Sequence, residues 1–185
     1  MRKRLFAGVC LAALGIVLLG QQAAQPTPEK LAPYYPTPQS VVEKMLELGG
    51  LKAGEWHYDL GSGDGRVVIT AAQKFGAHSI GYEIDDELYN KSMGRIKELG
   101  LAKLANIVKG DLAKADFGKP DLITVYLLPS SNDKLLPVFE KTMKKGSRLV
   151  SHDFEFSGWK AEKTVNVEDN DEGYSRSHTL YLYLR

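Results

Sequence analysis

The sequence of 185 residues predicts an α/β fold, a doubly wound, Rossmann-like sheet of seven strands with helices on both faces. From about residue 37 to residue 153, short apolar runs typical of buried strands alternate with segments of helical periodicity. Two further strand-like runs follow at the C-terminus and predict an antiparallel hairpin. In a sheet of this kind the ligand binds at the carboxyl ends of the parallel strands.

The composition divides the chain into three segments. Residues 1–24 carry basic side chains at positions 2–4 and then an uncharged apolar run, Leu5–Gly20, which is typical of a signal peptide or an N-terminal membrane anchor. Residues 25–36 are rich in Pro and Gln and are interpreted as a linker. Residues 37–185 are expected to form one domain and to be monomeric.

The expected helices and strands follow each other in alternation. The first helix begins with Thr37 as its N-cap and Pro38 in its first turn, and it ends at Gly49-Gly50. Asp85 is expected to cap a helix that Gly100 closes. The remaining elements are strands at residues 56–60, 78–83, 105–109, 121–128, 147–153, 163–167 and 177–184, and helices at residues 66–75 and 135–145.

A glycine-rich segment, Asp59-Leu60-Gly61-Ser62-Gly63-Asp64-Gly65-Arg66, lies between the first expected strand and a helix. Backbone N–H groups and a helix N-terminus face a nucleotide-like ligand in this layout. A dinucleotide motif would place its third glycine at position 66, and a triphosphate loop would end in Gly-Lys-Ser/Thr; neither is present. The acidic Asp59 favours a cationic ligand, which matches the sulfonium and α-amino groups of S-adenosylmethionine (SAM).

Two further acidic residues follow strand-like runs. Glu83 lies about 20 residues beyond the glycine turn, where a carboxylate accepts both ribose hydroxyls of a nucleoside; its alternative is a capping or solvated acid. Asp111 follows the third strand and is interpreted either as an acceptor for the adenine amino group or as a solvated turn residue.

Four segments together resemble one small group of proteins. The glycine segment is similar to motif I of the class I, seven-stranded SAM-dependent methyltransferases. With Pro33-Tyr34-Tyr35-Pro36-Thr37-Pro38, Val125-Tyr126-Leu127-Leu128 and Ser151-His152-Asp153-Phe154-Glu155-Phe156, it resembles the protein-lysine methyltransferases that include the archaeal broad-specificity enzyme and the mitochondrial enzymes for the ATP synthase c-subunit and the adenine nucleotide carrier. The resemblance spans about Tyr34 to Leu184 and implies methyl transfer from SAM to a lysine ε-amine of a protein partner.

The resemblance also implies roles for individual residues. Tyr126 and Asp153 are expected to face the substrate as catalytic residues, because both stand at strand ends; the alternative is strand-end packing and a surface acid. An acidic or phenolic acceptor there would help a lysine to become a neutral nucleophile. The expected cofactor-binding residues are Tyr34, Thr37, Asp59, Gly61, Ser62, Gly63, Gly65, Glu83 and Asp111.

Several other site classes are not expected. The net charge of +1 gives no electrostatic case for nucleic acid, and the single cysteine, Cys10, excludes a cysteine-based metal site in the folded part. No metal site is expected, because the four histidines show no ligand spacing. Ser151, His152 and Asp153 are not expected to form a relay, because neighbours on a strand point to opposite faces.

Two other functions and the localisation stay open. The domain is alternatively a class I methyltransferase of a small molecule or nucleic acid, or a non-catalytic SAM-binding module. SAM is a cytosolic metabolite, whereas basic residues before an apolar run direct the following domain outward. The sequence therefore leaves open whether the domain is membrane-associated through residues 5–20, exported, or in contact with the cytoplasm.

Overall fold

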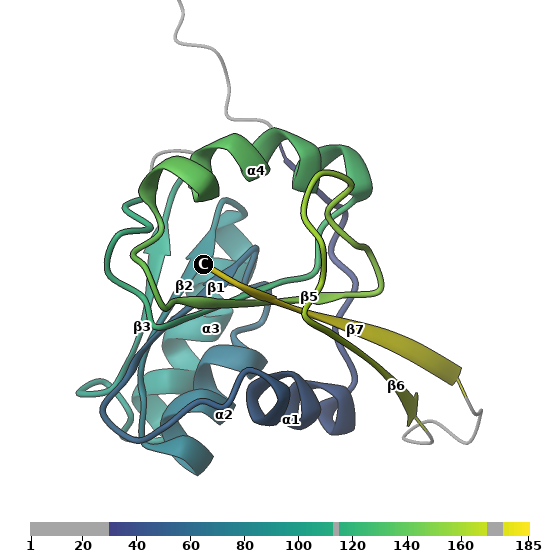
Figure 1. Ribbon diagram of the computed structural model, residues 1–185. Coiled ribbons are helices and arrows are strands. Elements are labelled where there is room, and N and C mark those ends of the chain that lie inside the picture. Colours follow the sequence, from purple (N-terminus) through teal and green to yellow (C-terminus); the bar gives the residue numbers. More distant parts are fainter. Residues whose placement is uncertain (1–29, 113–114, 170–175) are drawn as a thin grey trace, which may run out of the picture.

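A mixed seven-stranded sheet forms the centre of the computed structural model, which describes residues 30–112, 115–169 and 176–185 (Figure 1). The strands are β1 (Trp56–Leu60), β2 (His78–Glu83), β3 (Ala105–Lys109), β4 (Leu122–Val125), β5 (Arg148–His152), β6 (Lys163–Asp169) and β7 (Arg176–Leu184). Their order is β3-β2-β1-β4-β5-β7-β6, with β1 to β5 parallel and β7 antiparallel to both of its neighbours. The predicted fold class is confirmed.

Helices cover both faces of this sheet (Figure 1). In the described part of the chain they are α1 (Gln39–Leu48), α2 (Arg66–Phe75), α3 (Asp86–Glu98) and α4 (Pro129–Thr142). α1, α2 and α3 lie on one face and α4 on the other (Figure 1). The chain order of the strands reverses between β1 and β4, and a crevice opens at the carboxyl ends of strands at such a switch point.

Apolar side chains fill the space between each helix layer and the sheet. On the first face, Met45 of α1 packs with Val150 of β5 and Leu180 of β7. On the other face, Phe139 of α4 is fully buried and meets the rings of Phe117 and Phe156 edge-on, at centroid distances of 5.0 and 5.9 Å. Burial on both sides holds the strand ends, and therefore the site, in a rigid frame.

The predicted start of the first helix is wrong by one residue. Pro38 is the N-cap of α1, and the helix has no side-chain cap. The Thr37 hydroxyl instead lies 3.2 Å from His152 Nδ1, across to the end of β5. A tertiary hydrogen bond has therefore replaced the local cap that the sequence predicted. The predicted N-cap Asp85 is confirmed, since its carboxylate accepts from the backbone N–H groups of Glu87 and Leu88.

Two strands end earlier than predicted. β4 ends at Val125, its last partner on β5, so Tyr126 lies just beyond the strand. α4 then begins at Pro129 and ends at Thr142, whereas a helix over residues 135–145 was predicted, because proline fits the first turn of a helix. β5 ends at His152, and Asp153 leaves it with a φ of 57°, the left-handed region.

The predicted signal or anchor at residues 1–24, and the first part of the linker at residues 25–36, lie outside the described residues. Among the residues that the structure describes, no helix has the length and apolar character needed to span a membrane. The end of the linker, from Lys30, crosses the carboxyl edge of the sheet and is tied down at both ends. Lys30 Nζ lies 2.7 Å from Asp85 Oδ2, and Arg66 donates to the carbonyl of Thr37 at 2.8 Å.

Candidate functional site

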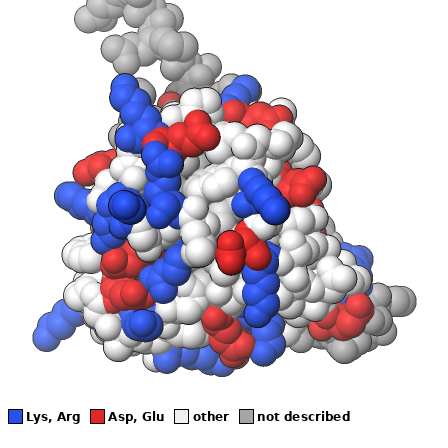
Figure 2. Space-filling model, in the orientation of Figure 1, with Lys and Arg blue, Asp and Glu red and all other residues white. Residues whose placement is uncertain are grey.

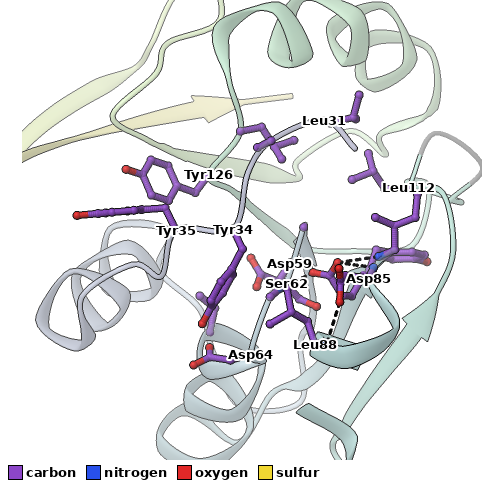
Figure 3. Close-up of a pocket in the computed structure, with 18 of the residues that line it drawn as sticks. Leu31, Tyr34, Tyr35, Asp59, Ser62, Asp64, Asp85, Leu88, Leu112 and Tyr126 are labelled. Atoms are coloured by element: carbon purple, nitrogen blue, oxygen red, sulfur yellow. Dashed lines mark hydrogen bonds between the residues drawn. The ribbon is translucent and has the colours of Figure 1, made fainter. Parts of the chain in front are cut away.

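A cavity of about 1000 Å³, including the part open to solvent, lies at the carboxyl ends of β1, β2 and β4 beneath the segment from Lys30 to Thr37 (Figure 3). Of the expected site residues, all but Gly65 and Asp153 line the cavity. The lining residues among them are Tyr34, Thr37, Asp59, Gly61, Ser62, Gly63, Glu83, Asp111 and Tyr126.

The glycine loop is held against the end of β2. The N–H groups of Gly61 and Ser62 donate to the carbonyl of Tyr82 at 3.0 and 2.9 Å, and that of Gly63 donates to Glu83 Oε2 at 2.7 Å. Gly63 has a φ of 53°, and a Cβ atom there would lie 2.8 Å from the ring of Tyr34. Glycine at this position therefore lets Tyr34 lie directly over the loop.

Gly65 serves the loop in a different way. It is the N-cap of α2 with a φ of 77°, and a Cβ atom there would lie 2.8 Å from Cβ of Ser92 on α3. Its position lets two helices approach closely behind the cavity. Gly65 thus shapes the loop without lining the cavity.

Glu83 is more constrained than the sequence indicates. Its side chain is buried and accepts three backbone N–H groups: Ile84 and Asp85 at Oε1, both at 2.8 Å, and Gly63 at Oε2. A carboxylate has about four acceptor positions. The geometry leaves one of them, at Oε2, for a hydroxyl from the cavity, where the sequence predicted that both ribose hydroxyls would be accepted.

A buried hydrogen-bond chain leads to Asp59. The Thr124 hydroxyl donates to Asp59 Oδ1 at 2.7 Å, so its oxygen accepts from His57 Nε2 at 2.9 Å. His57 Nδ1, 2.8 Å from Oγ of Ser79, then accepts from that hydroxyl. Burial lowers the pKa of His57 to about 3, so the ring is neutral and holds this direction at physiological pH.

Asp59 itself has a strongly shifted pKa. Burial raises the pKa of its carboxyl to about 7; the hydrogen bond from Thr124 opposes the rise, and the nearby carboxylates of Glu83 and Asp64 add to it. A cation in the cavity would favour the ionised carboxylate. Asp59 is therefore an acid that a cationic ligand can switch to its charged form.

Two further side chains complete the lining. Ser62 lines the cavity, and its Oγ atom is buried against Gly81 with no hydrogen-bond partner in the structure. Asp64 pairs with Arg66 through two hydrogen bonds, Nε to Oδ1 at 3.0 Å and Nη2 to Oδ2 at 2.9 Å. The cavity offers buried carboxylates and an aromatic ring, Tyr34, and these groups fit a cationic nucleoside such as SAM (Figure 3).

Tyr126 and Asp153 lie next to each other beside this cavity. The Tyr126 hydroxyl donates to Asp153 Oδ2 at 3.3 Å, and the Tyr126 ring lies over His152 with centroids 3.9 Å apart. Burial, followed by the charge of Asp153, raises the pKa of Tyr126 to about 12. The phenol therefore stays protonated at neutral pH and acts as a hydrogen-bond donor.

Sequence reasoning missed the part played by two histidines. His152 Nε2 lies 2.9 Å from His178 Nδ1 and 3.4 Å from Asp153 Oδ2. The prediction that His152 and Asp153 point apart is wrong, because the positive φ of Asp153 turns its side chain back toward the ring. His178 arrives from β7, two residues before the partner of His152 in the β5–β7 ladder. The spacing of His152 and His178 in the sequence does not predict that their side chains contact each other.

Comparison with known proteins places the chain among methyltransferases. The ANTKMT methyltransferase domain matches residues 59–163. A protein-lysine N-methyltransferase of Saccharolobus islandicus is 40% identical over 153 residues, which cover 82% of this chain and 92% of that protein. The mouse lysine N-methyltransferase for the ATP synthase c-subunit is 29% identical over 133 residues, which cover 72% of this chain and 53% of that protein.

A solved structure agrees with these matches. The crystal structure of an RNA methyltransferase from Salinibacter ruber, in complex with S-adenosyl-L-homocysteine, is 42% identical in sequence and has a TM-score of 0.74. It covers 81% of this chain, and this chain covers 93% of it. Taken with the domain match and the archaeal relative, the sheet order and the acid-lined crevice show that the chain belongs to the ANTKMT methyltransferase family.

Proposed function

We propose that this protein is a SAM-dependent methyltransferase that methylates a lysine ε-amine of a protein substrate. The observation that supports the proposal is that two features lie side by side. One is the cavity lined by acidic side chains, and the other is the hydrogen-bonded pair Tyr126–Asp153 at its edge. The names of the archaeal and mouse relatives support lysine as the acceptor. The S-adenosyl-L-homocysteine found in the Salinibacter structure supports SAM as the cofactor.

The cavity residues would hold the cofactor as follows. Asp59 would meet its amino acid end, and Glu83 Oε2 has one position for a ribose hydroxyl. Asp111 lines the part of the cavity beyond β3 and is proposed to accept from the adenine amino group. Tyr34 and Thr37 close the cavity from above. When bound there, SAM would supply an electrophilic methyl group. The amine would attack the methyl carbon in line with the sulfur, and S-adenosyl-L-homocysteine would leave.

Tyr126 and Asp153 would then position the lysine amine and help it to lose its proton. Asp153 attracts the lysine ammonium by charge, and with the oxygen of Tyr126 it aims the nitrogen toward the cavity. The amine attacks only as the neutral base, so a proton must leave first. Asp153, whose side chain is 26% exposed, has access to solvent and can accept that proton and release it.

RNA is the second candidate substrate, because the Salinibacter relative is described as an RNA methyltransferase. A nucleic-acid substrate usually meets a basic patch or stripe. Figure 2 shows Lys and Arg side chains mixed with Asp and Glu on the face displayed. Asp153, which lies beside Tyr126 at the edge of the cavity, would repel a phosphate backbone and attract a lysine. The charges of the site therefore favour a protein.

The test is to incubate the full-length chain with methyl-labelled SAM and either a protein extract that includes membrane proteins or total RNA. We expect label in protein, recovered as methyl-lysine after acid hydrolysis. Asp153→Asn and Tyr126→Phe should each lower the rate about 100-fold, because positioned proton-transfer groups contribute on this order. His78→Asn, which changes a histidine stacked on Trp56 away from the cavity, is the matched control and should keep full activity.

Three outcomes would contradict the proposal. Label in RNA alone would assign the second candidate. Label in small molecules would point to another class of methyltransferase. Binding of SAM without transfer to any acceptor would identify a non-catalytic SAM-binding module.

A further inference from the structure

We propose that His152, His178 and Asp153 form a binding site for one divalent transition-metal ion, of which Zn²⁺ is the best match. The three residues come from the ends of two paired strands, β5 and β7, and lie beside Tyr126. Among the described residues they form a group whose ligand atoms all lie within 4.8 Å of one another. The inference concerns ion binding and does not depend on which molecule is methylated.

The ligand atoms form a compact triangle. His152 Nε2 and His178 Nδ1 are 2.9 Å apart, His178 Nδ1 and Asp153 Oδ2 are 3.2 Å apart, and His152 Nε2 and Asp153 Oδ2 are 3.4 Å apart. Around a tetrahedral ion with bonds of about 2.1 Å, neighbouring ligand atoms are separated by about 3.4 Å. The triangle is therefore close to the size that one such ion requires.

Contacts outside the triangle orient two of its members. The Thr37 hydroxyl oxygen lies 3.2 Å from His152 Nδ1 and can accept a hydrogen bond from an N–H at that nitrogen. The lone pair of Nε2 then faces the triangle. The backbone N–H of Thr179 donates to Asp153 Oδ1 at 2.9 Å and leaves Oδ2 on the inner side. Metal-binding histidines and carboxylates are held by outer hydrogen bonds of this kind.

His178 makes its side-chain contacts through one ring nitrogen, Nδ1. Its side chain is 7% exposed, and Nε2 is buried with no hydrogen-bond partner in the structure. A buried polar atom without a partner costs about 1–3 kcal/mol. A cation between the three ligand atoms would replace the close contacts of Nδ1 with metal bonds, whereas Nε2 would stay without a partner.

Chemistry and access both favour a transition metal. Two imidazole nitrogens and one carboxylate oxygen suit Zn²⁺ or its neighbours, whereas Ca²⁺ and Mg²⁺ prefer oxygen ligands. The side chain of His152 is fully buried, so an ion bound there would be shielded from solvent on that side. The partly exposed Asp153 gives the ion a route from solvent.

The strained backbone of Asp153 fits the same interpretation. Its φ of 57° is unusual for a residue other than glycine, and strain of this kind is concentrated at functional sites. The strain turns the carboxylate inward to the two histidines. If the proposed methyl transfer holds, an ion on Oδ2 of Asp153 would compete with the lysine ammonium for this carboxylate and would slow the transfer.

The experiment titrates the full-length, untagged chain, after removal of metal by a chelator, with Zn²⁺ in a calorimeter. We expect one ion per chain, and at least tenfold weaker binding in His178→Asn and in Asp153→Asn. Thr37→Val removes no ligand but loosens His152, and should weaken binding about tenfold. The matched control His78→Asn keeps the affinity of the natural chain.

A second measurement covers the case in which a variant does not fold. Co²⁺ added to the natural chain should produce the visible absorption of a four-coordinate ion with nitrogen ligands, and an equivalent of Zn²⁺ should remove it. Circular dichroism without metal identifies variants that retain the fold. Equal affinity in the natural chain, His178→Asn and Asp153→Asn, or no ion bound to the natural chain, would overturn the proposal.

Discussion

At the scale of single residues, the site depends on how burial sets the charge of Asp59. The chain Ser79–His57–Thr124 ends on this carboxyl, and only its last member touches the cavity lining. Because His57 is neutral and donates toward Thr124, the threonine hydroxyl always points its proton at Asp59. Residues that contact no ligand thus determine the behaviour of one that does.

The pH dependence of SAM binding follows from this carboxyl. Its pKa in the cofactor-free chain is about 7, and a bound cation lowers that pKa, so binding strengthens as pH rises toward 7 and weakens below it. We expect roughly fivefold weaker binding at pH 6 than at pH 7, measured by calorimetry.

Two variants test the origin of this effect. Thr124→Val removes the hydrogen bond that opposes the raised pKa, so the pH at which binding weakens should move upward. Asp59→Asn cannot ionise and should bind weakly at both pH values. An unchanged pH profile in Asp59→Asn would show that another group is responsible.

At the scale of elements, the turn between β1 and α2 determines where the glycine loop of the site lies. Gly65 joins the glycine loop to α2 and permits contact with α3. Neither the junction of Gly65 with α2 nor its contact with α3 involves the cavity directly, but both determine where the glycine loop lies. The position of the cavity therefore depends on the packing of helices behind it.

Substitution of this glycine should destabilise the fold. In Gly65→Ala the left-handed backbone and the approach to Ser92 together cost about 2–4 kcal/mol, to be measured by urea unfolding. Gly94 is the matched control: it is exposed inside α3, and a Cβ atom there would meet nothing within 4 Å. Gly94→Ala should stabilise by about 1 kcal/mol. Equal effects of the two changes would contradict the role assigned to Gly65.

At the scale of the whole molecule, the site is assembled from distant parts of the chain. The segment from Lys30 lies over the ends of β1, β2 and β4, and Arg66 and Asp85 hold it there. A ligand in the cavity contacts all of these parts at once. Binding should therefore stabilise the domain as a unit.

Thermal unfolding provides the measurement. SAM at 100 times its dissociation constant should add about 2.7 kcal/mol, which corresponds to a rise of about 5–11 °C in the melting temperature. ATP at the same concentration shares the adenosine but carries phosphates, which the acidic lining repels, and it should shift the temperature much less. An equal shift with ATP would show that the carboxylates do not select a cationic ligand.

The order of strands and the glycine loop could be predicted because local chemistry decides them. β1, α2, β2 and β3 have the predicted bounds, since apolar runs, glycines and the Asp85 cap mark them within a few residues. The ends of β4 and β5 could not be predicted. A strand ends where its neighbour stops pairing, and that depends on a partner far away in the chain.

The sequence by itself determined the fold class, the family and nine of the residues that line the cavity, because each depends on residue types at short spacing. The tertiary structure alone decided how those groups are used. It placed three backbone N–H groups on Glu83, turned Asp153 toward His152, and brought His178 to both. The physical reason is that strand alternation specifies which face a side chain occupies, whereas sheet pairing and backbone strain decide what it meets there.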